Sequence, residues 1–161
     1  MKYLITTSLL LLLTGIIQAQ EKNEPTTQQI VESKNYIFKA ESVSPPRGRL
    51  RHLTSEYDLV VTSDTVIAYL PYFGRAYSAP INPSEGGIKF TSANFEYTAD
   101  KKKTRSWEIL IRPKDAPDIQ ALYLTIFDNN KASLRVNSLN RESISFNGYI
   151  VEGKEKEKKA F

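Results

Sequence analysis

Residues 56–70 read EYDLVVTSDTVIAYL, and this stretch decides the class of fold. Apolar or aromatic residues occupy positions 57, 59 and 61, whereas positions 56 and 58 are acidic. This period of two is typical of a β-strand with one buried face. Ser63-Asp64 then forms a short polar connection into TVIAYL. Two strands joined so tightly predict an antiparallel β-hairpin.

Strand patterns continue on both sides of this hairpin. The segments are YIFKAESV (36–43), GGIKFTSANFEYTAD (86–100), SWEILIR (106–112), IQALYLTIF (119–127), KASLRVNS (131–138) and ESISFNGYIV (142–151). Within 86–100 the inward register changes, so we expect a bulge or a turn at 92–94. Residues 119–127 are apolar on both faces, as a central strand is, and Asn147-Gly148 predicts a turn or bend.

The predicted fold is all-β. About eight strands follow one another through short connections, without a helix between them, and such neighbours must be antiparallel because parallel pairs need long crossovers. An antiparallel sheet of this size tends to close on itself, which removes exposed edges. We therefore expect an up-and-down barrel of lipocalin-like topology, with a β-sandwich as the alternative.

The N-terminal residues 1–19 have the layout of a signal peptide. Lys2 precedes an apolar run, Leu9–Ile17, and small Ala19 precedes Gln20. The run is too short for a membrane helix, which needs about 20 apolar residues. We expect a polar leader at 20–34 with a short helix near Gln28–Lys34, one β-domain at 35–151, and a charged disordered tail at 152–161.

The composition limits the cellular environments and the kinds of partner that we expect for the protein. The chain has no cysteine, so neither disulfides nor a lipid-bearing cysteine is expected, and stability must come from packing. The net charge is +4, and part of it lies in the tail EGKEKEKKAF. No basic patch alternates with stacking rings, so we expect no nucleic-acid partner. The expected location is the periplasm or the exterior of the cell, without a membrane span.

The residues that most enzymes use are scarce. His52 is the single histidine and lies among arginines, which favours a surface position. No zinc or calcium ligand set is recognisable, and no esterase nucleophile motif occurs. The acidic pairs Glu56/Asp58 and Asp115/Asp118 suit polar strand faces and loops as well as glycosidase chemistry. We therefore expect no catalytic residues, no metal, no cofactor and no enzymatic activity.

The segment YLPYFGRAYSAP (69–80) carries more rings than a connection usually does. Its aromatic and cationic side chains either fold back as a lid on the barrel end or stand open for a partner. These candidate ligand- or partner-binding residues are Tyr69, Tyr72, Phe73, Arg75 and Tyr77. Gly86-Gly87 follows and predicts a strand-entry turn with close backbone approach, because a strand pattern comes directly after it.

Four segments together resemble a known family. LTSEYDLVV (53–61), YLPYFGRAYSAP (69–80), EGGIKFTS (85–92) and ISFNGYI (144–150) are similar to the exported bacterial proteins of domain-of-unknown-function family 4251. The resemblance covers roughly Ser33 to Val151. It implies a periplasmic or secreted β-rich domain of Bacteroides-type Gram-negative bacteria, and it implies no activity. Many such proteins look like lipoproteins, whereas this chain lacks the lipid-bearing cysteine and is expected to be free in the periplasm.

The expected function is therefore a non-enzymatic binding domain, which takes an unknown small ligand or an envelope protein at the aromatic loop. An envelope-structural or inhibitor-like interaction module is the alternative. A hydrolase that uses two carboxylates is the third hypothesis, and it requires two acidic groups facing each other in a cleft. The sequence leaves the oligomeric state open.

Overall fold

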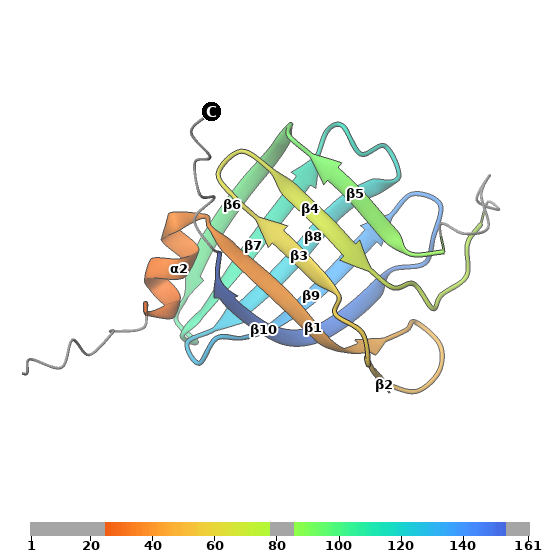
Figure 1. Cartoon of the computed structure of the whole chain (residues 1–161), viewed down its shortest axis with the longest axis horizontal. Coiled ribbons are helices and arrows are strands. Elements are labelled where there is room, and N and C mark those ends of the chain that lie inside the picture. Colours follow the sequence, from red (N-terminus) through yellow and green to blue (C-terminus); the bar gives the residue numbers. More distant parts are fainter. Residues whose placement is uncertain (1–24, 78–85, 154–161) are drawn as a thin grey trace, which may run out of the picture.

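The computed structural model describes residues 25–77 and 86–153, and the predicted signal peptide and most of the predicted tail lie outside them. One antiparallel sheet of ten strands curls into a nearly closed barrel (Figure 1). The elements are α2 (Thr27–Ser33), β1 (Tyr36–Ser44), β2 (Arg51–His52), β3 (Asp58–Val61), β4 (Val66–Leu70), β5 (Ile88–Ser92), β6 (Phe95–Lys102), β7 (Ser106–Pro113), β8 (Ile119–Phe127), β9 (Lys131–Ser138) and β10 (Ile144–Glu152).

The strand order is β5-β4-β3-β1-β10-β9-β8-β7-β6, with β2 added beside β1. Apart from β2 and β3, and from β5 and β6, strands consecutive in the sequence pair with each other, and β1 pairs with β10, so the prediction of an up-and-down barrel is confirmed. The sheet does not close between β5 and β6, although a short turn joins them. From that turn the two strands diverge across the barrel, as Figure 1 shows.

The barrel interior is filled by the alternate residues that the sequence pattern placed inward. Tyr36 and Phe38 of β1, Leu59 and Val61 of β3 and Phe146 of β10 are fully buried. Leu122, Leu124 and Ile126 of β8 meet them from the opposite wall of the same cluster. Burial of these side chains supplies the main favourable term for folding, and no disulfide adds to it.

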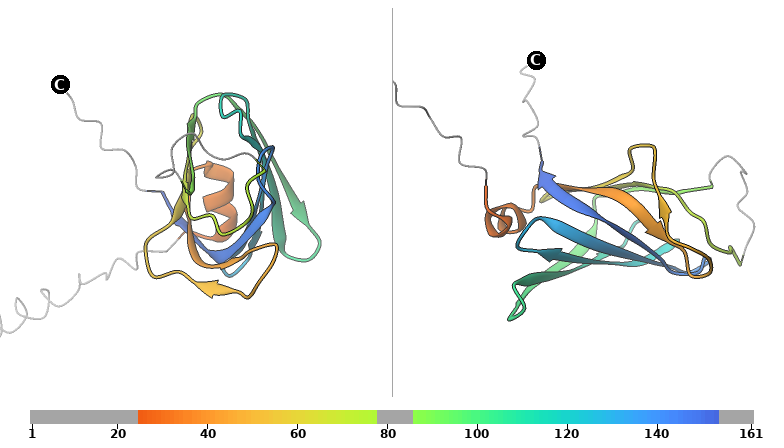
Figure 2. Two further views of the ribbon diagram at one scale, coloured as in Figure 1. Left: turned by 90° about the vertical axis from the view of Figure 1, so that its right-hand side faces the viewer. Right: turned by 90° about the horizontal axis from the view of Figure 1, so that it is seen from below.

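The predicted N-terminal helix is confirmed as α2. Thr26 caps it by accepting from the backbone N–H of Gln29, and the Gln29 side chain accepts in return from the Thr26 backbone. Ile30 and Val31 are buried against the core. Seen along the barrel, α2 is framed by the ring of strands, and the second view places it at one end of the barrel (Figure 2). The helix therefore covers that end, and the opposite end is formed by loops.

The prediction of a turn or bend at Asn147-Gly148 is wrong. Strand β10 runs without interruption from Ile144 to Glu152, and Gly148 lies opposite Ala40 beside a register shift in β1. A Cβ on Gly148 would overlap the carbonyl oxygen of Lys39. The glycine is therefore needed for close approach of two backbones, which can also place a glycine inside a strand.

Candidate functional site

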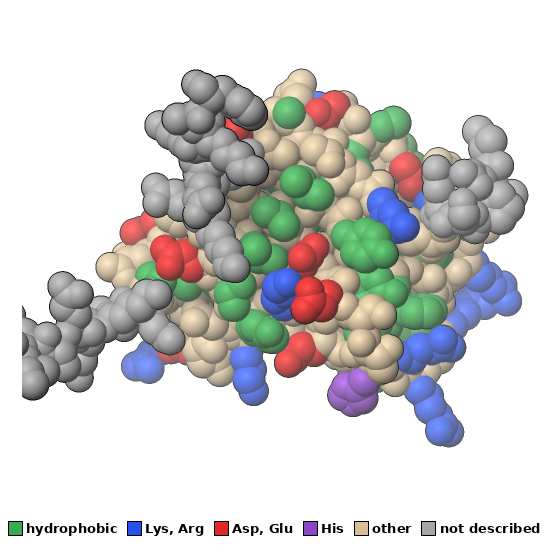
Figure 3. Space-filling model, viewed as in Figure 1, with side chains coloured by type: hydrophobic (Ala, Val, Ile, Leu, Met, Phe, Trp, Pro, Cys, Tyr) green, Lys and Arg blue, Asp and Glu red, His purple; other side chains and the backbone are tan. Residues whose placement is uncertain are grey.

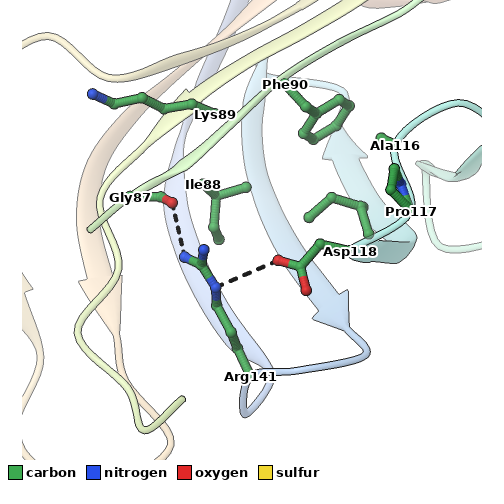
Figure 4. A pocket seen from close by; sticks show the side chains of 9 residues that line it. Gly87, Ile88, Lys89, Phe90, Ala116, Pro117, Asp118 and Arg141 are labelled. Carbon is green, nitrogen blue, oxygen red and sulfur yellow. Dashed lines mark hydrogen bonds and ion pairs between the residues drawn. The ribbon is translucent and has the colours of Figure 1, made fainter. Parts of the chain in front are cut away.

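A groove of about 320 Å³ opens beside β5 at the loop end of the barrel. One wall is residues 87–90, the start of β5 and the glycine before it. The other is residues 116–119, where the β7–β8 connection enters β8. Arg141, from the β9–β10 connection, lies between the two walls (Figure 4). We call this space the β5 groove. It is lined by three segments that are far apart in the sequence.

Apolar side chains form most of the groove wall. Ile88, Ala116 and Ile119 are buried, and Phe90 is half-buried on the inner face of β5. The polar side chains that face it are Asp118 and Arg141, whereas the Lys89 side chain points away from it (Figure 4). Apolar walls with a few placed polar groups are the usual composition of small-molecule sites, which measure about 300–1,000 Å³. The groove lies at the small end of that range.

Arg141 is held in place from several sides. Its Nη1 donates to the carbonyl oxygen of Gly87 at 2.8 Å, and its Nε lies 3.4 Å from Oδ2 of Asp118. The guanidinium also lies over the ring of Tyr72, 5.4 Å from the ring centre. Only 17% of the Arg141 side chain is exposed. A guanidinium fixed in this way is suited to binding a carboxylate, because its planar donors match the two carboxylate oxygens.

Asp118 connects Arg141 to the rest of the loop end. Its Oδ1 accepts from the side-chain amide of Asn140 at 3.0 Å, and its backbone carbonyl accepts from Leu139 N at 3.0 Å. The carboxylate therefore orients the arginine and fixes the β9–β10 connection against the β7–β8 connection. This arrangement positions the guanidinium before any ligand arrives.

The aromatic segment reaches the groove through Tyr72. The Tyr72 hydroxyl donates to the carbonyl oxygens of Arg75 at 2.7 Å and Glu142 at 3.0 Å. Desolvation, followed by the charge of Glu142, raises the pKa of Tyr72. The ring folds back over Gly74, where a Cβ would overlap its hydroxyl. Tyr72 thus lies under Arg141 and joins the aromatic segment to the β9–β10 connection.

Further backbone bonds attach this segment to the β9–β10 connection. Tyr77 N donates to Asn140 O at 2.7 Å, and Glu142 N donates to Arg75 O at 3.1 Å. Arg75 itself contributes this carbonyl, while its side chain is exposed. The cations over the rings of Phe73 and Tyr72 are instead Arg51, at 5.1 Å, and Arg141.

The five predicted site residues do not form one site. Tyr69 lies on the outer face of β4, stacked on Tyr57 with ring centres 5.6 Å apart and covered by Lys89 at 4.9 Å. Hydrophobic side chains gather on this outer face in Figure 3. Phe73 is 41% exposed and Tyr77 is 71% exposed. Of the five, Tyr72 contacts Arg141 of the groove through its ring, whereas Tyr69 contacts the Lys89 side chain on the outer face.

Sequence reasoning missed Arg141 and residues 116, 117 and 119, and it considered Asp118 only as an acid paired with Asp115. Arg141 lies in the polar stretch NSLNRES between two strands, and no periodicity distinguishes it there. Gly87 was correctly predicted to make a close backbone approach, since a Cβ on it would lie 2.7 Å from Leu70 O. Its hydrogen bond with Arg141 depends on how the barrel brings the two connections together, and no local sequence pattern indicates it.

The candidate acidic pairs are engaged in structural contacts. Asp115 caps the β5–β6 turn: Oδ1 accepts from Ser92 Oγ at 2.5 Å, and Oδ2 accepts from Ala93 N at 2.9 Å and Asn94 N at 3.1 Å. The Ser92 bond, then the Ala93 bond, lowers the pKa of Asp115. Glu56 and Asp58 both face Lys39 Nζ, at 4.0 and 3.5 Å.

His52 is exposed on β2, as the sequence predicted. Within residues 25–77 and 86–153, no group of three or more histidines, cysteines or acids is placed to hold a metal ion. The same residues include no helix long and apolar enough to cross a membrane.

Comparison with known proteins gives a family and a fold. No curated protein matches the chain. A similar solved structure is that of a DUF4251 family protein from Bacteroides eggerthii, with 14% sequence identity and a TM-score of 0.55 over 76% of this chain and 83% of that one. At this identity the likeness supports the fold alone. The model of the family described as Domain of unknown function (DUF4251) matches residues 18–150, so the chain belongs to this family.

Proposed function

We propose that the protein is an exported, non-enzymatic binding domain and that the β5 groove takes a small ligand with a carboxylate and an apolar body. The observation that carries the proposal is the partly buried guanidinium of Arg141 between apolar walls. The apolar body would lie against Ile88 and Phe90, and the carboxylate would pair with Arg141. Such burial of apolar area with one charge-assisted contact is the usual way in which small sites combine affinity and orientation.

The charged side chains that face the groove are those of Arg141 and Asp118, whereas the Lys89 ammonium lies over the Tyr69 ring on the outer face. Asp118 already accepts from Asn140, so its charge is shared between the loop and the arginine. At this end of the barrel, Asp115 accepts hydrogen bonds from the β5–β6 turn and Asp118 pairs with Arg141. These structural contacts support a binding role over a hydrolytic one.

Export is supported by the signal-peptide pattern of residues 1–19. Intact mass measurement of the protein recovered from the periplasm tests this part of the proposal. We expect a chain that begins at Gln20. A chain that retains Met1 would contradict export by cleavage.

Native mass spectrometry of the protein isolated from its own cells tests ligand binding. We expect an added mass that disappears on denaturation, that is lost in Arg141→Gln and that persists in Arg135→Gln. Arg135 is a matched control, because it also lies over a tyrosine ring, 5.0 Å from Tyr123, but on the outer face of β9. A bare mass for the wild-type protein, or an equal added mass in Arg141→Gln, would contradict the proposal.

A further inference from the structure

We infer that the β5 groove receives the extended C-terminal segment of another protein, which adds as an antiparallel strand to the free edge of β5 and places its terminal carboxylate at Arg141. The inference rests on the proposed role of the groove in binding a carboxylate, and it assigns that carboxylate to the C-terminus of a peptide segment in place of a small molecule. It is carried by the direction of the backbone groups along β5.

The hydrogen-bond pattern of the β3–β4 hairpin fixes that direction. Thr62 N donates to Thr65 O at 2.9 Å, so these residues form a hydrogen-bonded pair at the turn. Bonded and non-bonded pairs alternate along an antiparallel ladder. The register pairs Val60 with Ile67 and Asp58 with Tyr69, and these are therefore the bonded pairs.

The alternation then carries over to β5. Because Ile67 and Tyr69 direct their backbone groups to β3, the backbone groups of Val66, Ala68 and Leu70 face β5. Their partners across the ladder are Ser92, Phe90 and Ile88. The remaining residues of β5, Lys89 and Thr91, therefore direct their N–H and C=O groups to the opposite edge.

That edge is free in the described part of the chain, where β5 ends the sheet. Gly87, two residues before Lys89, has its carbonyl oxygen on the same side, where it accepts from Arg141. Figure 4 shows this carbonyl directed towards Arg141. Unpaired donors and acceptors at a sheet edge are a template for a further strand.

The position of Arg141 sets the direction of the added strand. A strand antiparallel to β5 ends beside Gly87, where β5 begins, and its C-terminal carboxylate arrives at the guanidinium. Antiparallel pairing is also the more stable arrangement per residue. Ile88 and Phe90 line the same groove and would contact side chains of the added segment.

A library of heptapeptides displayed with free C-termini tests the inference on the exported protein. We expect selected peptides to bind as carboxylates and to weaken at least about tenfold as C-terminal amides, because a charge-assisted bond is lost. On binding, hydrogen exchange of the Lys89 and Thr91 amides should slow. Equal binding of acid and amide, or protection confined to other amides, would overturn the inference.

The variant Lys89→Pro provides an independent test. Its missing N–H belongs to the free edge, where proline is tolerated, so the fold should persist and peptide affinity should fall at least about tenfold. Lys89→Ala, which keeps the N–H, is the matched control and should retain most of the affinity. The exchange measurement on wild-type protein does not depend on the folding of either variant.

One result separates this inference from the proposed function. If hexanoate, a small carboxylate with an apolar tail, binds wild-type protein and Lys89→Pro equally while the library yields no binder, strand addition is wrong and a small-ligand groove remains.

Discussion

Nη1 of Arg141 donates to the carbonyl oxygen of Gly87 at 2.8 Å, across 54 residues of sequence. This bond joins the β9–β10 connection to the start of β5, at the end of the barrel where β5 has no second neighbour. The residue proposed to bind the ligand therefore also stabilises the wall of the groove. Stability and binding must be measured separately for each variant of this residue.

Arg141→Gln should lower the free energy of unfolding by about 1–3 kcal/mol, because Gly87 O and Asp118 lose a charged partner in a partly buried setting. Arg135→Gln, on the exposed outer face, should stay within about 0.5 kcal/mol of wild type. Urea unfolding followed by tryptophan fluorescence measures both. Equal stability of the two variants would show that the Arg141 contacts do not support the fold.

Gly148→Ala should destabilise the barrel by about 3 kcal/mol, at the upper end of the usual range for single substitutions. The new methyl group would overlap Lys39 O, and two backbones would have to separate. Gly86→Ala is the control, because nothing lies within 4 Å of the added Cβ. Thermal unfolding compares the two. A wild-type melting temperature for Gly148→Ala would show that β1 and β10 are less closely apposed.

Tyr97→Phe should cost about 1–3 kcal/mol, because it leaves the hydroxyl of fully buried Tyr36 without its partner. The two hydroxyl oxygens are 3.2 Å apart, where β1 and β6 face each other inside the barrel. The double variant Tyr36→Phe/Tyr97→Phe should lose less than the sum of the single variants. Strict additivity in a double-mutant cycle would mean that the two hydroxyls are not coupled.

Asp115→Asn should change the acid dependence of stability. Hydrogen bonds from Ser92 and Ala93 lower the pKa of Asp115 in the folded state, whereas the unfolded value is about 3.9. Its stabilising contribution is therefore complete above the unfolded pKa and is lost as pH falls through the lower folded pKa. The wild type should lose more unfolding free energy than Asp115→Asn between about pH 5 and pH 2.

Asp100→Asn is the control for this titration, since Asp100 is an exposed carboxylate on β6. At pH 7 its free energy of unfolding should stay within about 0.5 kcal/mol of wild type. Parallel curves for wild type and Asp115→Asn would contradict the capping role of Asp115.

The fold was largely predictable because a strand with one buried face imposes period two on its residues. Alternation correctly placed Ala132, Leu134 and Val136 of β9 inward, and the register change at 92–94 correctly indicated an interruption. The structure shows that interruption to be a turn. Its cap, Asp115, lies on a remote connection, which no local pattern indicates.

The site was much less predictable. The rings of the aromatic segment predicted a binding site, but Tyr69 lies on the outer face of the barrel, and Phe73 and Tyr72 lie beneath arginines. The groove is lined by the start of β5, the β7–β8 connection and the β9–β10 connection, beside the edge of β5 that does not pair with β6. The sequence pattern predicts that consecutive strands pair, so it does not predict this opening. Arg141 acquires its role from Gly87, Asp118 and Tyr72, none of which is its neighbour in sequence.

The most direct test of the central claim is an amide-resolved NMR titration of the protein with hexanoate, with hexanamide as the uncharged control. The account predicts saturable shifts for hexanoate at the amides of residues 87–90, 116, 118 and 119, weaker binding of hexanamide, and loss of the hexanoate shifts in Arg141→Gln. Saturable shifts that are confined to another part of the barrel, or no saturable shifts with either compound, would contradict the account.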